Sequence, residues 1–210
     1  MSKMRKSIAW LAELLPAAGR QLKLMLVIFA GYLGHVCIMP YLKIGDMSPS
    51  LLIAAIAIVT VGYGMLRGFW TGLFYGIVME TLLPTVNMLN LLFYPICALL
   101  GGVFFADRSA AQLQYARSIG KRGRNLSPLL RTVLCAALIV TIYEMVNLVY
   151  MYLSGAGLTG SLIRRGLADV FGTTLLTAII MIPVRKLLGF RKMEEEHAPE
   201  MRFDHRPARD

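Results

Sequence analysis

The chain has 210 residues, of which 57% are apolar and only 16% are charged, and its mean hydropathy is +0.61. A soluble domain of this length needs a larger polar shell, so the composition excludes an ordinary soluble protein. The net charge of +10 would suggest nucleic acid in a soluble chain. Here the basic residues cluster between apolar runs, as expected for cytoplasmic loops that face anionic lipids.

The chain opens with residues 1–21, in which Ser7–Leu15 predicts a short amphipathic helix on the inner membrane surface. Six apolar runs follow, whose lengths are about what a helix needs to cross the hydrocarbon core, although the second and third are near the lower limit. They cover residues 22–42, 50–66, 68–83, 87–106, 132–153 and 167–184. The sequence therefore predicts an all-α, six-helix membrane domain over residues 22–184. A basic cytoplasmic loop at 107–131 and a flexible cytoplasmic tail at 185–210 complete it.

The distribution of Lys and Arg predicts the orientation of these helices. If the N-terminus is cytoplasmic, only Lys43, Arg164 and Arg165 of the 22 Lys and Arg residues lie outside. This asymmetry follows the positive-inside rule and predicts that both termini are cytoplasmic. Arg165 precedes Asp169 by one helical turn, so an ion pair between them is the simplest explanation of the exception. An external binding surface is the alternative.

Glycines recur every fourth residue in the third apolar run, at Gly68, Gly72 and Gly76. Residues four apart lie on one face of a helix, and a face of glycines lets another backbone approach closely. The preferred interpretation is that this face packs against another helix of the same chain. Contact with a helix of another protein is compatible with it.

Two acidic residues in the apolar runs are candidates for function. Glu80 follows Gly76 on the same helix face, and Glu144 lies in the fifth run between Tyr143 and Asn147. A carboxylate that faces lipid is unfavourable, so Glu80 should point into the bundle or toward the headgroup layer. Glu144 is either a functional group or a hydrogen-bonded residue that locks two helices together.

Sequence motifs for catalysis are missing. The chain has no H-E-x-x-H, no P-loop, and no Ser/His/Asp or Cys/His set at one membrane depth. An ion-driven transporter usually has more buried charges or a repeated broken helix. The sequence therefore predicts a protein that is not an enzyme and that needs no cofactor or metal.

Residues 47–108 carry a pattern of proline, Arg-Gly step, spaced glycines, acid, asparagine and glycine pair. Its members here are Pro49 before Leu51-Leu52-Ile53, Arg67-Gly68, Gly72, Gly76, Glu80, Asn87 or Asn90, and Gly101-Gly102. This stretch resembles the core of the MreD rod-shape-determining membrane protein family. It departs from that pattern in having glutamate rather than aspartate at Glu80, no glycine in Pro84-Thr85-Val86, and an atypical Pro95-Ile96-Cys97.

The resemblance implies a non-enzymatic scaffold of the cell-elongation machinery in the bacterial cytoplasmic membrane. Such proteins bind the single-span protein MreC and help to organise peptidoglycan synthases with the actin-like MreB filament. Partner helices would then bind through the faces that carry Gly68, Gly72, Gly76, Glu80 and Glu144.

MreD proteins are also similar in shape to the S components of energy-coupling-factor transporters, which defines the alternative function. An S component binds a vitamin in an outward-facing site and docks to ATPase and coupling subunits. The candidate residues for such a site are Tyr41, Lys43, Asp46, Trp70, Tyr75, Arg164 and Arg165. Trp70 and Tyr75 qualify only if they face inward.

Overall fold

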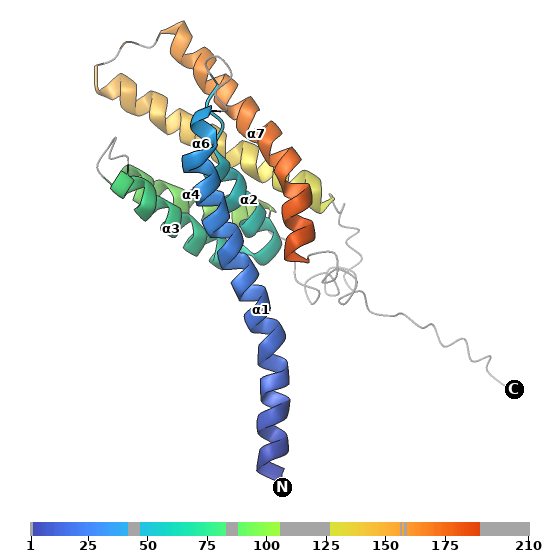
Figure 1. The fold of residues 1–210 in the computed structure, drawn as a ribbon. Coiled ribbons are helices and arrows are strands. Elements are labelled where there is room, and N and C mark those ends of the chain that lie inside the picture. Colours follow the sequence, from blue (N-terminus) through green and yellow to red (C-terminus); the bar gives the residue numbers. More distant parts are fainter. Residues whose placement is uncertain are drawn as a thin grey trace, which may run out of the picture.

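The structure is a computed structural model, and it describes residues 2–41, 47–82, 88–105, 127–155, 157 and 159–189. Within these ranges every regular element is a helix, so the predicted all-α class is confirmed (Figure 1). In chain order the elements are α1 (Ser2–Cys37), the short 3-10 helix η1 (Met39–Tyr41), α2 (Leu51–Tyr63), α3 (Met65–Leu82), α4 (Leu89–Phe105), α6 (Pro128–Leu153) and α7 (Gly160–Leu188).

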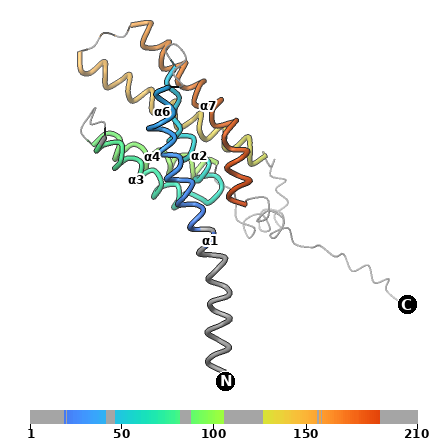
Figure 2. The backbone as a smooth tube through the Cα atoms, in the orientation of Figure 1, coloured from blue at the N-terminus to red at the C-terminus, as the bar shows by residue number. Residues whose placement is uncertain are grey.

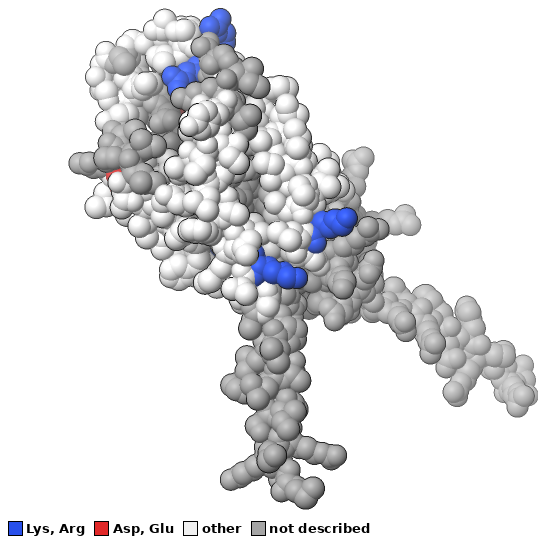
Figure 3. All heavy atoms as spheres, in the orientation of Figure 1, with Lys and Arg blue, Asp and Glu red and all other residues white. Residues whose placement is uncertain are grey.

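Three stretches are long and apolar enough to cross a membrane: Gln21–Tyr41, Pro128–Leu153 and Gly160–Leu188. The helices α2 and α4 are apolar but shorter. Large apolar side chains are exposed on the outside of α1, α3, α4, α6 and α7. On the face drawn in Figure 3, the charged atoms of the described residues lie toward the two ends, with uncharged surface between them. Lipid is the natural environment for such a surface.

The helices alternate in direction through the bundle. The helices α3 and α4 form one antiparallel pair and α6 and α7 another, as the backbone trace shows (Figure 2). Neighbouring residues fix the directions: Gly34 with Leu51, Gly31 with Ala55, Gly68 with Thr60, Gly76 with Asn90, Gly101 with Cys135, Ser50 with Thr173, and Ile58 with Met181. We call the end where α2 and α7 begin the upper end. Because Val27 and Leu188 belong to one cluster near the other end, α1 enters and α7 leaves at the lower end.

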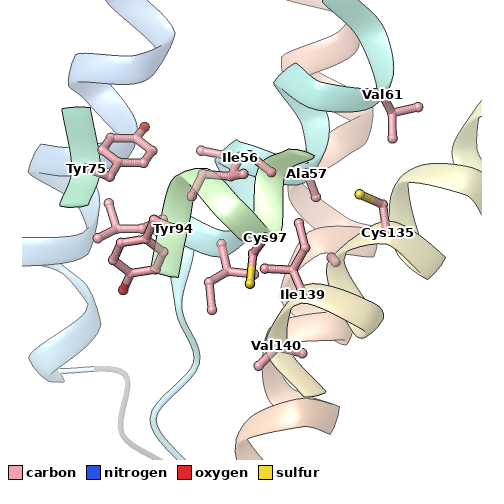
Figure 4. Packing of buried hydrophobic residues seen from close by; sticks show 14 residues of the cluster. Ile56, Ala57, Val61, Tyr75, Tyr94, Cys97, Cys135, Ile139 and Val140 are labelled. Atoms are coloured by element: carbon pink, nitrogen blue, oxygen red, sulfur yellow. The ribbon is translucent and has the colours of Figure 1, made fainter. Parts of the chain in front are cut away.

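The helix α2 is the centre of the bundle. It packs against α1, α3, α4, α6 and α7, and its ten consecutive residues Leu52–Val61 are all buried. Figure 4 shows its side chains Ile56 and Ala57 meeting Cys97 of α4 and Ile139 of α6. A helix that is apolar on all sides is expected in such a position. At 13 residues, α2 is only about 20 Å long.

The boundary between the second and third helices differs from the sequence prediction. Hydropathy placed it at Arg67-Gly68, but α2 ends at Tyr63 and α3 begins at Met65. The break falls at Gly64, whose φ of 93° is readily adopted only by glycine. Arg67 instead lies in the first turn of α3, where its guanidinium is 4.9 Å from the ring centre of Tyr63.

The ends of the chain also differ from the prediction. Ser7–Leu15 is not a separate helix, because α1 continues without a break to Cys37. The side chains of Ser7–Leu15 lie outside the described residues, so their position on the membrane surface stays a prediction. The tail was expected from residue 185, yet α7 continues to Leu188, which is buried, and ends at Gly189 in the left-handed conformation. The rest of the tail, and residues 107–126 of the basic loop, lie outside the described ranges.

The glycine face of α3 packs within the chain, as the preferred interpretation held. A methyl group added at Gly72 would lie 2.7 Å from the carbonyl oxygen of Tyr94, and one at Gly76 would lie 2.8 Å from that of Asn90. Both contacts are with the backbone of α4. Gly68 faces the side chain of Thr60 in α2. The three glycines therefore let α3 approach α4 and α2 at backbone distance, where van der Waals contact stabilises helices in lipid.

We predict that Gly72→Ala and Gly76→Ala each destabilise the protein by about 1–3 kcal/mol, because backbone atoms of α4 cannot move aside cheaply. The matched control is Gly19→Ala in α1, where nothing lies within 4 Å of the added methyl group. It should be neutral or slightly stabilising. The midpoint of thermal unfolding in detergent, followed by size-exclusion chromatography, measures the difference. Equal midpoints for all three variants would contradict the close approach of α3 and α4.

Candidate functional site

Polar side chains gather in the upper half of the bundle. They come from α4, α6, α7 and the segment that leads into α2, and we call them the upper polar cluster. Its members are Ser48, Asn90, Tyr94, Tyr143, Glu144, Asn147 and Asp169. Elsewhere most described hydroxyl groups of Thr simply donate to the backbone carbonyl one turn earlier in their own helix, so the cluster is distinct.

Aromatic rings join α4 to α6 in this cluster. Tyr94 and Tyr143 stack with their ring centres 5.8 Å apart and their planes only 4° from parallel. Phe93 meets Tyr143 edge to face at 5.4 Å. The hydroxyl of Tyr143 donates to Oδ1 of the buried Asn90 at 3.5 Å, and Asn147 lies one turn further along α6. These polar groups are thus directed at one another across the α4–α6 interface.

The helix α7 holds the segment that precedes α2. The carboxylate of Asp169 accepts a hydrogen bond from the backbone N–H of Ser48 and lies 3.2 Å from its hydroxyl. One turn further on, the hydroxyl of Thr173 accepts from the N–H of Ser50 at 3.0 Å. Gly172 lies between Asp169 and Thr173 in the sequence of α7, and a Cβ added to it would lie 3.6 Å from the Cβ of Pro49. We call this set of contacts the α7 clasp.

Local sequence explains both sides of the α7 clasp. Asp169, Gly172 and Thr173 are three and four residues apart and so share one face of α7. Pro49 has no N–H, which leaves the N–H groups of Ser48 and Ser50 to bind that face. Ser50 is also the N-cap of α2, where its hydroxyl accepts from Ile53. A carboxylate near the start of α2 is further favoured by the helix dipole.

Glu144 lies beside α7 in the same half of the bundle. It is half-buried, and its carboxylate is 3.6 Å from where a Cβ would lie on Gly166. Asp169 and Arg165 are its charged neighbours. Glu144 therefore points at the α6–α7 interface and not at lipid. Asp169 has a different partner from the one predicted: it is buried and binds Ser48, whereas Arg165 is exposed.

Glu80 closes the turn between α3 and α4. Its Oε1 accepts a hydrogen bond of 2.6 Å from the backbone N–H of Met88, the residue before α4. Met88 has a φ of 65°, in the left-handed region that a side chain normally avoids. A carboxylate at the start of α4 satisfies an N–H that the helix leaves unpaired. The described contact gives Glu80 a structural role in this hairpin.

The residues proposed for an outer ligand site do not converge among those that the structure describes. Tyr41 is 88% exposed on η1, and Trp70 is 58% exposed on the outside of α3. Tyr75 does face inward, but it is fully buried and donates to the backbone carbonyl of Ile28 at 2.8 Å. Arg164 and Arg165 are exposed at the start of α7. Lys43 and Asp46 lie outside the described residues.

Sequence reasoning missed most of the upper polar cluster. The sequence pattern offered Asn90 only as one candidate for the asparagine of the family pattern. Asp169 was assigned to Arg165, and Ser48 was not considered. The polar and small residues at three- and four-residue spacing in α7 were a usable signal, because they mark a face that binds something other than lipid.

No protein-family model matches the chain, and no curated protein or solved structure matches it either. Within the described ranges, no group of three or more His, Cys, Asp or Glu side chains is placed to hold a metal ion. Function must therefore be inferred from the residues themselves.

We predict that Glu80→Leu lowers the thermal midpoint, because the N–H of Met88 loses its acceptor, at a cost of about 1 kcal/mol. Glu80→Gln retains an acceptor oxygen and should lose less. The control is Thr81→Val, whose exposed hydroxyl donates only to Val78 in its own helix. The measurement is thermal unfolding in detergent. If Gln were as harmful as Leu, the charge of Glu80 would matter more than its hydrogen bond.

We also predict that Asp169→Leu destabilises the protein by about 1–3 kcal/mol, because it leaves the N–H of Ser48 without a partner. Asp169→Asn keeps an acceptor for that N–H and should be milder. Arg165→Leu is the discriminating control, since the α7 clasp does not use Arg165. Denaturant titration of the purified protein measures all three. A loss for Arg165→Leu equal to that for Asp169→Leu would show that the ion pair is the important contact.

Proposed function

We propose that the chain is a six-span protein of the bacterial cytoplasmic membrane with both termini in the cytoplasm. The alternation of the six helices supports this topology, since α1 enters and α7 leaves at the same end. The apolar exterior and the basic residues near the lower end are consistent with it. The helices α2 and α4 are short, and α2 is shielded from lipid by its neighbours.

Within that membrane we propose a non-enzymatic scaffold of the cell-elongation machinery, which binds single-span partners and peptidoglycan synthases. The observation that carries this proposal is that the polar side chains of the upper half and the glycines of α3 make contacts within the bundle, although the buried hydroxyl of Thr60 has no hydrogen-bond partner among the described residues. The upper polar cluster joins α4 to α6, the α7 clasp holds α2, and the glycines of α3 meet α4. A packed interior with an apolar exterior suits a protein that binds partner helices on its outside.

The alternative is an S component of an energy-coupling-factor transporter, which one observation favours. The upper polar cluster combines stacked tyrosines with two amides and two acids on the side assigned to the cell exterior. Small-molecule sites commonly combine aromatic walls with a few convergent polar groups. We rank this function second, because those groups contact one another and the proposed outer ligand residues do not converge.

We predict that affinity purification from the native membrane in mild detergent recovers a single-span protein with an extracytoplasmic coiled coil. Recovery of two ATPases and a coupling subunit, or of a tightly bound vitamin, would replace the scaffold by the S component.

We expect Glu144→Gln to leave folding intact and to reduce recovery of the partner several-fold. The control is Thr141→Val on the same helix, whose hydroxyl donates only to Ala137. Unchanged recovery with Glu144→Gln would assign Glu144 to packing alone.

A further inference from the structure

The helices α6 and α7 are much longer than the rest of the bundle requires. They have 26 and 29 residues, whereas α2 has 13 and α4 has 17. At 1.5 Å per residue, α6 and α7 are about 39 and 44 Å long. The hydrocarbon core is about 30 Å thick, and the bilayer with its headgroups is about 40–45 Å. Their connected ends project beyond the other helices at the upper end (Figure 1). We call the described residues 148–155, 157 and 159–167 the α6–α7 tip.

The last residues of α6 are exposed on every side of the helix. Five consecutive residues have exposed fractions between 42% and 76%: Val149, Tyr150, Met151, Tyr152 and Leu153. On α7, Ile163 and Leu167 are exposed as well. A helix that docks on one protein partner needs a single apolar stripe, because only one face is covered. Apolar and aromatic side chains on all faces instead indicate immersion in an apolar or interfacial medium.

The charge of the α6–α7 tip is exclusively positive. From Met145 to Ala168 the sequence contains Arg164 and Arg165 and no acidic residue. Both arginines are exposed on the first two turns of α7. Arginine binds phosphate with several parallel N–H donors, and tyrosines such as Tyr150 and Tyr152 are enriched where acyl chains meet headgroups. The combination matches the headgroup layer of a membrane that contains anionic lipid.

We propose that the α6–α7 tip lies in the outer headgroup layer and binds the phosphates of anionic phospholipids through Arg164 and Arg165. Tyr150 and Tyr152 anchor it at the level of the glycerol groups. This site explains why two arginines occur on the side where the positive-inside rule expects few. It rests on the membrane topology proposed above, but not on the identity of any protein partner.

The test places a fluorescent reporter in the tip of the full-length chain. Trp10 and Trp70 are replaced by Phe, Tyr152→Trp supplies the reporter, and the protein is reconstituted in nanodiscs of phosphatidylcholine and phosphatidylglycerol. One of the two lipids carries bromine atoms high on its acyl chains, where they quench nearby tryptophan. We expect brominated phosphatidylglycerol to quench several-fold more effectively than brominated phosphatidylcholine. The double variant R164A/R165A should abolish that preference, because it removes both cationic groups that bind the lipid phosphates.

The matched control removes two positive charges at the other end, with Lys23→Ala and Lys186→Ala, and should leave the preference intact. Quenching without preference for phosphatidylglycerol would overturn the lipid site. Absence of quenching, with the reporter accessible to iodide in water, would overturn it in favour of a protein-docking tip. Because nanodiscs expose both leaflets, the result is independent of sidedness. The lipid site does not depend on any protein partner, so a failed search for elongation partners would not contradict it. Likewise, absence of the lipid preference would not contradict the proposed scaffold function.

Discussion

The fold depends on one constraint, which is that α2 must be covered on all sides by other helices. A helix whose ten central residues are all buried needs neighbours at close range around its whole circumference. Small residues make this possible: Gly31 and Gly34 of α1 approach Ala55 and Leu51, and Gly68 of α3 approaches Thr60. In lipid, helices gain little hydrophobic free energy by associating with one another, because lipid tails are as apolar as their side chains. The stability of this arrangement therefore comes from close packing and from hydrogen bonds between polar groups.

Polar contacts fix the position of α2 and its neighbours along the bundle, which close packing of apolar side chains alone would specify less strictly. The α7 clasp fixes the upper end of α2 through backbone N–H groups, which side-chain mutation in α2 cannot alter. The stacked tyrosines fix α4 against α6 at a similar height. A membrane interior makes each unpaired N–H or hydroxyl unfavourable, so these bonds favour one arrangement of helices over others. The same groups that could have formed a ligand site are largely engaged in holding the bundle.

Hydropathy alone predicted the helical class and the approximate places of the helices. Hydropathy placed the helix boundaries at charged residues, and several of these boundaries differ from those in the structure. The helix α7 begins at Gly160 and continues past Arg164 and Arg165, and α6 begins at Pro128 because Ser127 caps it. The spacing of Gly72 and Gly76 correctly indicated close packing, because periodicity within one helix is a local property. No local pattern could pair Ser48 with Asp169, which are 121 residues apart.

That separation has a consequence for how the protein is made. The chain emerges from the ribosome in order, so α2 is synthesised long before α6 and α7 exist to cover it. Because its surface is almost uniformly apolar, α2 can remain in contact with lipid, or with α1, α3 and α4, until α6 and α7 have been inserted. Only then can Asp169 and Thr173 engage the segment before α2. Completion of the fold is thus postponed to the end of translation, and a chain truncated before α7 lacks the hydrogen bonds that hold the upper end of α2.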